Sequence, residues 1–332
     1  MGGFDLEEER IKQEIRSHEA KRVVIQLPDG LRREASRLAE IIEKEGALAI
    51  VSADPCYGAC DLATEVAESL DADLVIHFGH SRMLKHERVA TVYVEAKATN
   101  SVDKAVEEAV PLLEKWQKIG LTTTVQHVHK LGRVKEILNQ HGKTVIVGDA
   151  GHLAYAGQVI GCDYSNAKAA ASDVDAFLFV GGGRFHALGV ALSTSKPVVV
   201  ADPYEHRAFA IEKAEEILKQ RWACINEAKK AQTFAILVGL KPGQKRMEKA
   251  LEIKKTLEKH GKKAFLFAVT EVAPDILQSF PSVDAFVNTS CPRVSIDDYS
   301  RFRKPVLTPA EVFVVAGTMS WEDLCKRGLL ES

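Results

Sequence analysis

The chain has 332 residues, of which 46% are hydrophobic and 27% are charged, and its formal net charge is -2. This length suits two or three domains of about 100–150 residues, and the near-neutral charge excludes a general attraction to nucleic acid or anionic membranes. No apolar run reaches the roughly 18–20 residues that cross a bilayer, and the polar segment 1–17 lacks the apolar core of a secretory signal. We therefore expect a cytoplasmic protein that binds neither membranes nor nucleic acid directly.

Short β-rich apolar runs alternate with amphipathic helical patterns along the chain. The expected strands are, in order, 23–27, 47–53, 74–78, 89–94, 121–125, 144–147, 177–180, 197–200, 234–238, 264–269, 285–287 and 305–307. The expected helices include a polar N-terminal one over 1–17, followed by 32–44, 102–118, 206–229 and 245–259. Several strand runs are apolar on both faces and end at Gly, Asp or Pro, which is typical of buried parallel strands.

The strand runs fall into three sets of four, which open at Val23, Leu121 and Phe234. We predict an α/β fold of three similar small units around a central site, each with a mostly parallel four-stranded sheet and helices on both faces. The expected units are residues 1–99, 100–203 and 204–332. Two domains that share one longer sheet are the alternative.

Three of the six cysteines lie in loops near the expected carboxyl ends of strands, where α/β proteins bind ligands. Cys60, Cys162 and Cys291 each have Gly, Pro or Asp beside them, and one falls in each unit. Structural disulfides are not expected in a reducing cytosol. Three thiolates on a 4Fe-4S cluster would leave one iron open for substrate. A Cys₃ zinc site is the rival, and three buried free thiols are the plain alternative.

The other cysteines differ in context. Cys224 and Cys325 lie in expected helices and are interpreted as core residues. Cys56 shares a loop with Cys60, and the two begin the Cys-x-x-x-Cys-x-x-Cys motif of the usual radical S-adenosylmethionine enzymes, but position 63 is Ala. From the residues alone, Cys56 is either a spectator or replaces Cys60 as a ligand.

Other polar clusters follow expected strands. His127 and His129 form a His-x-His pair, which without a third ligand is more typical of a structural or substrate-facing position than of a metal site. The turn Gly181-Gly182-Gly183 can present backbone N–H groups to a phosphate or carboxylate, although it is not the G-x-G-x-x-G of nicotinamide sites. Asp297-Asp298-Tyr299, just past Cys291, is assigned to the site rather than to a plain helix cap.

Taken in order, these loops resemble the archaeal diphthamide synthase family over nearly the whole chain. The segments that carry the resemblance are Tyr57-Gly58-Ala59-Cys60-Asp61, Gly79-His80-Ser81, Thr122-Thr123-Thr124-Val125-Gln126-His127, Gly157-Gln158-Val159-Ile160-Gly161-Cys162, Asp202-Pro203-Tyr204, Cys291-Pro292-Arg293-Val294, Asp297-Asp298-Tyr299 and Lys304-Pro305-Val306-Leu307-Thr308-Pro309.

The resemblance implies three related α/β domains, a homodimer, and one 4Fe-4S cluster held by one Cys per domain, at Cys60, Cys162 and Cys291. Cys56 is then an addition to the family's pattern and not a ligand. The implied activity is the first step of diphthamide biosynthesis, which needs an electron donor. The 3-amino-3-carboxypropyl group of S-adenosylmethionine is transferred as a radical to C2 of a histidine in translation elongation factor 2, and methylthioadenosine is left behind.

Binding of the charged methionine part calls for donors that read a carboxylate, such as Arg293 or backbone N–H groups. Further candidates for the S-adenosylmethionine pocket are Gln26, Gln126, His127, Gly182 and Asp298, and Gln26 could equally be a polar residue that closes the first strand. A quinolinate-synthase-like enzyme, which condenses and dehydrates small molecules by Lewis acidity, is the enzymatic alternative. A non-catalytic iron–sulfur or zinc-binding module is the alternative of a different class.

Overall fold

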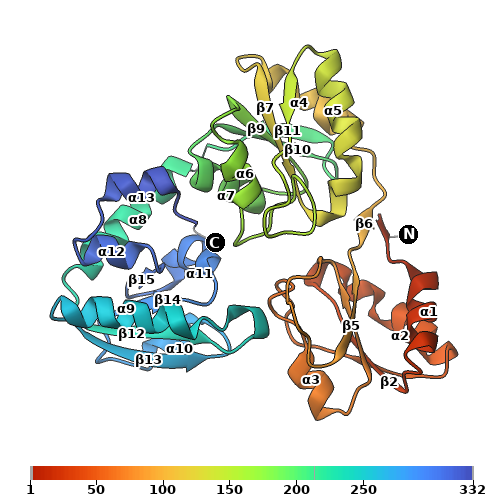
Figure 1. Cartoon of the computed structure of the whole chain (residues 1–332), viewed down its shortest axis with the longest axis horizontal. Coiled ribbons are helices and arrows are strands. Elements are labelled where there is room, and N and C mark those ends of the chain that lie inside the picture. The colour runs from red at the N-terminus through yellow and green to blue at the C-terminus, as the bar shows by residue number, and fades with distance from the viewer. Residues whose placement is uncertain (1–2, 213, 331–332) are drawn as a thin grey trace.

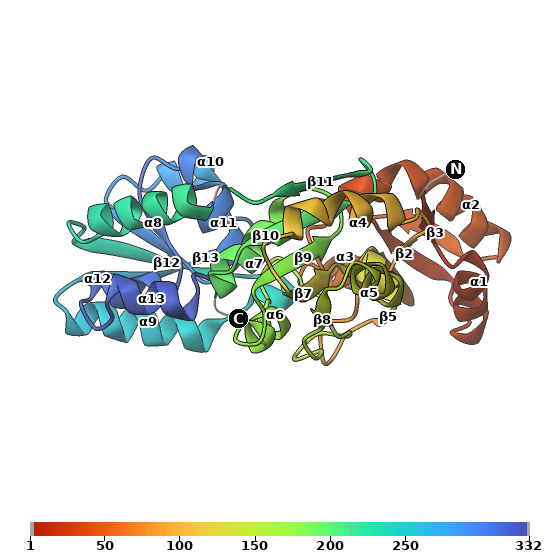
Figure 2. The same ribbon diagram turned by 90° about the horizontal axis from the view of Figure 1, so that it is seen from above.

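The computed structural model describes residues 3–212 and 214–330. Figure 1 shows three α/β units at the corners of a triangle, the N-terminal unit in red and orange, the middle unit in yellow and green, and the C-terminal unit in blue. In the perpendicular view of Figure 2, the units lie in one flat layer. No helix in the described ranges is both long enough and apolar enough to span a bilayer.

The N-terminal unit contains a parallel sheet in the order β3-β2-β4-β5. These strands are β2 (Arg22–Gln26), β3 (Leu48–Val51), β4 (Leu74–Phe78) and β5 (Ala90–Val94). Helices α1 (Glu8–Ser17), η1 (Asp29–Glu34) and α2 (Ala35–Lys44) cover one face, because their apolar stripes pack on alternate strand residues such as Val23 and Ile25. The short α3 (Thr64–Ser69) covers Val24 on the other face.

The middle unit contains a sheet in the order β11-β10-β9-β7-β8. Its strands are β7 (Lys118–Thr123), β8 (Thr144–Ile146), β9 (Ala176–Val180), β10 (Val198–Asp202) and the antiparallel β11 (Arg207–Ala210). One face packs against α4 (Asp103–Ala109) and α5 (Leu131–Gln140), and the other against α6 (Ser165–Ala170) and α7 (Phe185–Thr194). The short turns η2 (Pro111–Leu113) and η3 (Val125–Lys130) complete the unit.

The C-terminal unit contains a parallel sheet in the order β13-β12-β14-β15. Its strands are β12 (Thr233–Gly239), β13 (Lys263–Val269), β14 (Ala285–Asn288) and β15 (Val306–Leu307). Its helices and turns are α8 (Ala214–Ala228), η4 (Pro242–Gln244), α9 (Met247–Lys259), α10 (Pro274–Gln278), α11 (Pro292–Asp297), η5 (Tyr299–Arg301), α12 (Glu311–Val315) and α13 (Trp321–Arg327).

The units are joined in two different ways. One continuous hydrophobic core runs from the middle unit into the C-terminal unit and includes Val190 of α7, Ile225 of α8 and Leu324 of α13. The N-terminal unit has a separate core. Its first and last segments pair with each other as the short antiparallel strands β1 (Phe4–Asp5) and β6 (Lys97–Ala98).

All three sheets share one strand order. Numbered within each unit along the chain, the strands lie in the order 2-1-3-4, with β11 added at the edge of the middle sheet. In such open sheets, ligands bind beyond the carboxyl ends of the strands, where the order reverses between strands one and three. The prediction of three similar α/β units is confirmed, and the alternative of two domains sharing one sheet is wrong.

An aspartate contact also repeats in the three units. Asp73, Asp175 and Asp284 each precede the third strand of a unit and accept hydrogen bonds from two backbone N–H groups at the start of the first strand, at 2.7–3.0 Å. These backbone hydrogen bonds lower the pKa of each carboxyl. The four residues before and into the third strand read Val-Asp-Ala-Phe in both the middle and the C-terminal unit, a signal of the repeat that the sequence analysis missed.

Three predicted helices are shorter than expected. The polar helix expected over 1–17 begins only at Glu8, because Phe4–Asp5 pair as β1 with β6. The helix expected over 102–118 ends at Ala109, because Pro111 cannot donate an interior helical hydrogen bond, and β7 already begins at Lys118. The segment expected to begin a helix at 206 instead turns at His206, which has a left-handed φ of 52°, and pairs as β11 with β10. The middle sheet therefore extends past the expected boundary at residue 203.

Replacement of Asp284 tests the repeated contact. We expect Asp284→Ala to lower the free energy of unfolding by about 1 kcal/mol at pH 7, because two hydrogen bonds to a solvent-screened carboxylate are lost. Since the pKa of Asp284 is lowered in the folded chain, this contribution is complete above the unfolded value of about 3.9 and is lost as the pH falls through the folded pKa. Urea unfolding measured from pH 7 downward, with Ser282→Ala as control, checks this. A difference in the free energy of unfolding between Asp284→Ala and the unmodified protein that stays constant down to the lowest pH at which both fold would contradict this prediction.

Candidate metal centre

Three cysteines from three units lie close together. Cys60 lies between β3 and α3, Cys162 lies between β8 and α6, and Cys291 directly precedes α11 as its N-cap residue. All three are partly exposed. Each pair is close enough for the charge of one thiol to raise the pKa of another. The structure thus brings together three loops that are distant in the sequence.

The electrostatics of these thiols indicates a place for a cation. Burial, reinforced by the neighbouring Cys60 and Cys291, raises the pKa of Cys162 to about 12. Burial is also the main cause of the raised pKa of Cys60. Without a cation these two thiols are therefore protonated at neutral pH, and a bound metal would stabilise their thiolate forms. Three thiolates are a donor set suited to zinc or to an iron–sulfur cluster.

The C-terminal unit holds the Cys60 loop directly. The backbone N–H of Gly243 donates to the Cys60 carbonyl at 2.9 Å, and the side-chain amide of Gln244 donates to the Cys60 Sγ at 3.4 Å. The two loops are in such close contact that a Cβ on Gly243 would lie 2.5 Å from the Cys60 Cα. Only glycine permits this approach.

An ion pair strengthens the same contact. The ammonium group of Lys241 lies 2.9 Å from Asp61 in the N-terminal unit and 3.0 Å from Glu271 in its own unit. It also lies 4.7 Å from the ring centre of Tyr57, within the range of a cation–π interaction. Lys241 therefore links the residues on both sides of the Cys60 loop to the C-terminal unit.

The loops of Cys162 and Cys291 are braced against each other. Asn288 receives the Ser290 backbone N–H at 2.9 Å and donates to the Cys291 carbonyl at 2.7 Å, which fixes the turn after β14. Arg293 reaches across to the middle unit, where its guanidinium donates to the Phe185 carbonyl at 3.0 Å and the Tyr164 hydroxyl at 3.2 Å.

The six candidate pocket residues have different environments. Gln26 forms hydrogen bonds through both ends of its amide, because the nitrogen donates to the Asp61 carbonyl at 2.6 Å and the oxygen contacts the Ala63 N–H at 3.0 Å and His77 Nδ1 at 2.7 Å. Arg293 is also engaged, since Asp297 binds its guanidinium through two contacts, at 2.6 and 2.9 Å.

The remaining candidates lie at two places. Gln126 donates to the Gly79 carbonyl at 2.6 Å and so joins the middle unit to the N-terminal unit. His127 is buried, and its Nδ1 finds no hydrogen-bond partner within 3–212 and 214–330. It lies edge-on to Tyr204, which also packs over Gly182. Asp298 follows α11 and pairs with Arg301 at 3.3 Å. The pair His127 and His129 lies in the turn η3 rather than on one strand face.

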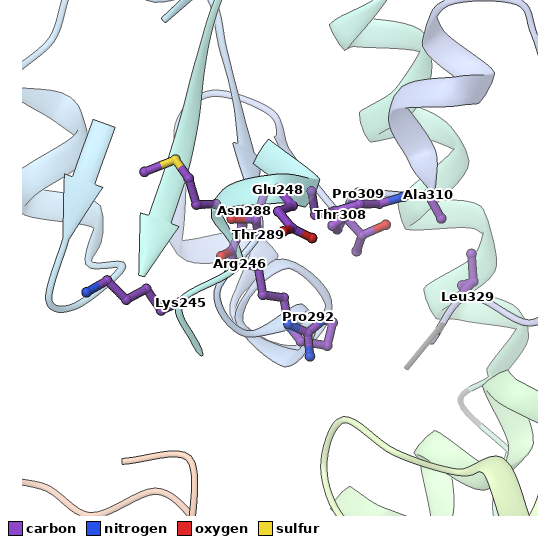
Figure 3. A pocket seen from close by; sticks show the side chains of 12 residues that line it. Lys245, Arg246, Glu248, Asn288, Thr289, Pro292, Thr308, Pro309, Ala310 and Leu329 are labelled. Atoms are coloured by element: carbon purple, nitrogen blue, oxygen red, sulfur yellow. The ribbon is translucent and has the colours of Figure 1, made fainter. Parts of the chain in front are cut away.

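A cavity of about 690 Å³ opens beside this centre in the C-terminal unit (Figure 3). Its walls include the start of α9 and the segments after β14 and β15. Lys245, Arg246 and Lys249 supply three positive charges to the lining, and Glu248 supplies one negative charge. Arg246 is close enough to Cys162 for its charge to lower the pKa of that thiol, against the larger effect of burial. The cavity therefore favours an anionic group next to the thiols.

The sequence analysis missed Lys241 and Gln244. The signal that could have pointed to them is their place, since Lys241-Pro242-Gly243-Gln244 directly follows the first strand of the third unit. That position corresponds to Gln126 in the middle unit, which was identified. What the sequence does not show is which loop of another unit these residues contact.

Comparison with known proteins gives consistent results. The family model of the diphthamide synthesis protein matches residues 27–325. The 2-(3-amino-3-carboxypropyl)histidine synthase of Pyrococcus horikoshii is 41% identical over 315 residues, covering 94% of this chain and 91% of that protein. Subunit 1 of the synthase with this name from Schizosaccharomyces pombe is 30% identical, covering 93% of this chain and 73% of the relative. The crystal structure of Dph2 from Pyrococcus horikoshii with a 4Fe-4S cluster has a TM-score of 0.90 at 38% identity and covers 99% of this chain and 95% of that chain.

Gly243→Ala tests the contact between the two units. The added Cβ meets the Cys60 Cα and Cβ, so the loops must separate, and we expect a loss of about 1–3 kcal/mol in stability. Reaction of Cys60 with a maleimide in metal-free protein should become faster. The control Gly132→Ala adds its Cβ where no atom lies within 4 Å, inside α5, and should stabilise by up to about 1 kcal/mol. Similar unfolding midpoints and labelling rates for both variants would refute the close approach.

Proposed function

This chain belongs to the family of diphthamide synthesis proteins, and from that premise we propose that it is a 2-(3-amino-3-carboxypropyl)histidine synthase. It transfers the 3-amino-3-carboxypropyl group of S-adenosylmethionine to C2 of a histidine in translation elongation factor 2. The observation that carries the proposal is the mutual proximity of Cys60, Cys162 and Cys291, one from each unit. The name of the similar Pyrococcus horikoshii protein and the cluster in the similar crystal structure support it.

The three thiolates would hold a 4Fe-4S cluster and leave one iron without a protein ligand. When bound, the cluster supplies the electron that breaks the bond between the sulfonium sulfur and the methionine Cγ, with methylthioadenosine as the other product. Overall, a new C–C bond replaces the C2–H bond of the histidine, one proton is released, and the electron is recovered when the imidazole regains its aromaticity.

The residues around the thiols position and protect this chemistry. Gln244 directs an N–H group at the Cys60 sulfur, and hydrogen bonds to cluster sulfurs raise the reduction potential because they stabilise the more negative reduced state. Lys241 and Gly243 keep the Cys60 loop against the C-terminal unit, which limits the access of water to the reacting atoms. Holding the sulfonium in one orientation decides which of its three C–S bonds breaks.

We assign the S-adenosylmethionine contacts from the hydrogen-bonding groups and charges that each candidate residue does not use within the protein. The positive wall of the cavity, with Arg246 near Cys162, suits the methionine carboxylate. His127 keeps an unpartnered ring nitrogen within the described ranges and lies with Gly182 beside Tyr204, so these residues are our choice for the adenosine part. Gln126 and Asp298 are retained as flanking contacts. Gln26 and Arg293 act mainly by positioning loops, because their hydrogen-bonding groups are largely used.

The remaining expectations are part of the same proposal. The protein works in the cytoplasm as a homodimer, with an external electron donor and elongation factor 2 as its protein substrate. The test is to mix anaerobic, reduced, cluster-loaded protein with S-adenosylmethionine and elongation factor 2. Methylthioadenosine and a modified histidine should form together. Fully loaded protein that forms neither product would overturn the proposal, and it would favour a condensing enzyme or a non-catalytic module.

Cys162→Ala tests the ligand set. Purified without oxygen, this variant should lose the brown cluster absorbance and the formation of methylthioadenosine together, because two thiolates from two units remain. Cys325→Ala removes a partly exposed cysteine in α13 and should retain both. Iron and sulfide analysis with the absorbance spectrum provides the measurement. An intact cluster in Cys162→Ala would remove Cys162 from the ligand set.

Gln244 variants test the hydrogen bond to the Cys60 sulfur. We expect Gln244→Leu to shift the cluster's midpoint potential to a more negative value, because one N–H···S contact is lost. Gln244→Glu should shift it further in the same direction, because it also adds negative charge. Anaerobic redox titration monitored by electron paramagnetic resonance measures both. Equal potentials in the three proteins would show that this hydrogen bond does not act on the cluster.

A further inference from the structure

A second group of metal-ligating side chains lies in the N-terminal unit, apart from the three cysteines discussed above. The ligand atoms of Cys56, His77 and His80 all lie within 4.8 Å of one another. Cys56 and His77 are buried, and His80 is partly buried. His77 is on β4, His80 follows that strand, and Cys56 lies in the loop after β3. This is the crevice between strands one and three, where a sheet of this order binds ligands.

The hydrogen bonds around Gln26 determine the protonation of His77. The Ala63 backbone N–H donates to Gln26 Oε1 at 3.0 Å, and Gln26 Nε2 donates to the Asp61 carbonyl at 2.6 Å, so the orientation of this amide is settled. The same Oε1 lies 2.7 Å from His77 Nδ1. Because an amide oxygen only accepts, His77 must carry its proton on Nδ1, and Nε2 keeps a lone pair.

This lone pair accepts a hydrogen bond from His80, whose Nδ1 therefore carries a proton that a bound metal ion would replace. His77 Nε2 lies 3.0 Å from His80 Nδ1, and in a tetrahedral zinc site two imidazole nitrogens lie about 3.3 Å apart and a nitrogen and a thiolate sulfur about 3.6 Å apart. Since all three ligand atoms lie within 4.8 Å of one another, their separations need to change by about 1.2 Å at most to reach these distances. Burial raises the pKa of the Cys56 thiol to about 12, against a smaller opposing effect of a backbone hydrogen bond from Gly58, so a bound zinc ion would have to displace the thiol proton.

The outer contacts also match those of a metal-bound histidine. Such a histidine donates its second N–H to a carbonyl or carboxylate, which orients the ring, and Gln26 has this relation to His77. The ring of His77 is further enclosed by Tyr93, whose centre lies 5.4 Å away. The ring of His77 is thus oriented as a ligand before any metal arrives.

We propose that Cys56, His77 and His80 form a binding site for a zinc ion, distinct from the site of Cys60, Cys162 and Cys291. The three side chains supply one sulfur and two nitrogen ligands, which suit zinc among the divalent metals of the cell. The fourth position stays open to water or to a ligand in the crevice. Because Gln26 binds both His77 and the backbone at Asp61 and Ala63, zinc would also stiffen the loop that carries Cys60.

Metal analysis of cluster-loaded protein tests the proposal. The cluster occupies its own cysteines in this form, so zinc added anaerobically and then dialysed against a weak chelator should remain at about one ion per chain. X-ray absorption at the zinc edge should show one sulfur at about 2.3 Å and two imidazole nitrogens at about 2.0–2.1 Å. Protein with a full iron content that retains no zinc, or zinc bound without sulfur, would overturn the proposal.

Variants identify the ligands. Cys56→Ser should lose zinc and keep its iron, whereas Cys325→Ser should keep both metals. Gln26→Leu should weaken zinc binding by about 10–100-fold through loss of the contact that orients His77. If Cys56→Ser retains zinc at the wild-type level, or loses iron instead, Cys56 is not a ligand of this site. If a variant fails to fold, the X-ray absorption spectrum of the wild-type protein at the zinc edge still shows whether zinc has one sulfur and two nitrogen ligands. None of these measurements depends on transferase activity.

Discussion

The candidate site depends on one geometric constraint, which is that the fold brings thiols from three α/β units close to one another. Each unit is a small sheet with its own loops, and no unit contains more than one of the cysteines Cys60, Cys162 and Cys291. Their relative positions are therefore set by contacts between units and not by any local motif. The glycine at 243, the ion pairs of Lys241 and the guanidinium of Arg293 are these contacts. The positions of the three thiols relative to one another therefore depend on these contacts.

Much of the fold could be predicted from the sequence because buried parallel strands are recognisable as short apolar runs. The runs at 74–78 and 234–238, for example, lie within the strands β4 and β12. Helix ends were less predictable, since the pattern over 206–229 looks helical throughout and only pairing with β10 makes Arg207–Ala210 a strand. The tertiary partner decides such a segment, and a single sequence does not contain it.

The candidate site was predictable to a similar degree. A candidate metal ligand such as a loop cysteine can be recognised in the sequence from its residue type and its position at a strand end. The hydrogen-bond or ion-pair partner of a side chain cannot be recognised in this way. The commitment of Gln26 to His77 and of Arg293 to Asp297 appears only in the folded chain, and so does the contact of Gln244 with Cys60. The paired Val-Asp-Ala-Phe segments were the clearest unused signal, because they mark equivalent turns in two units.

The continuity of the hydrophobic core divides the molecule into two mechanical parts. Cys162 and Cys291 sit on the middle and C-terminal units, which share one core, whereas Cys60 sits on a unit with a core of its own. Separating the first two would expose apolar surface to water, but the contacts of the Cys60 loop with the C-terminal unit are hydrogen bonds and ion pairs that water can replace at small cost. Separating the N-terminal unit from the other two would thus expose less of the buried apolar core than separating the middle unit from the C-terminal unit.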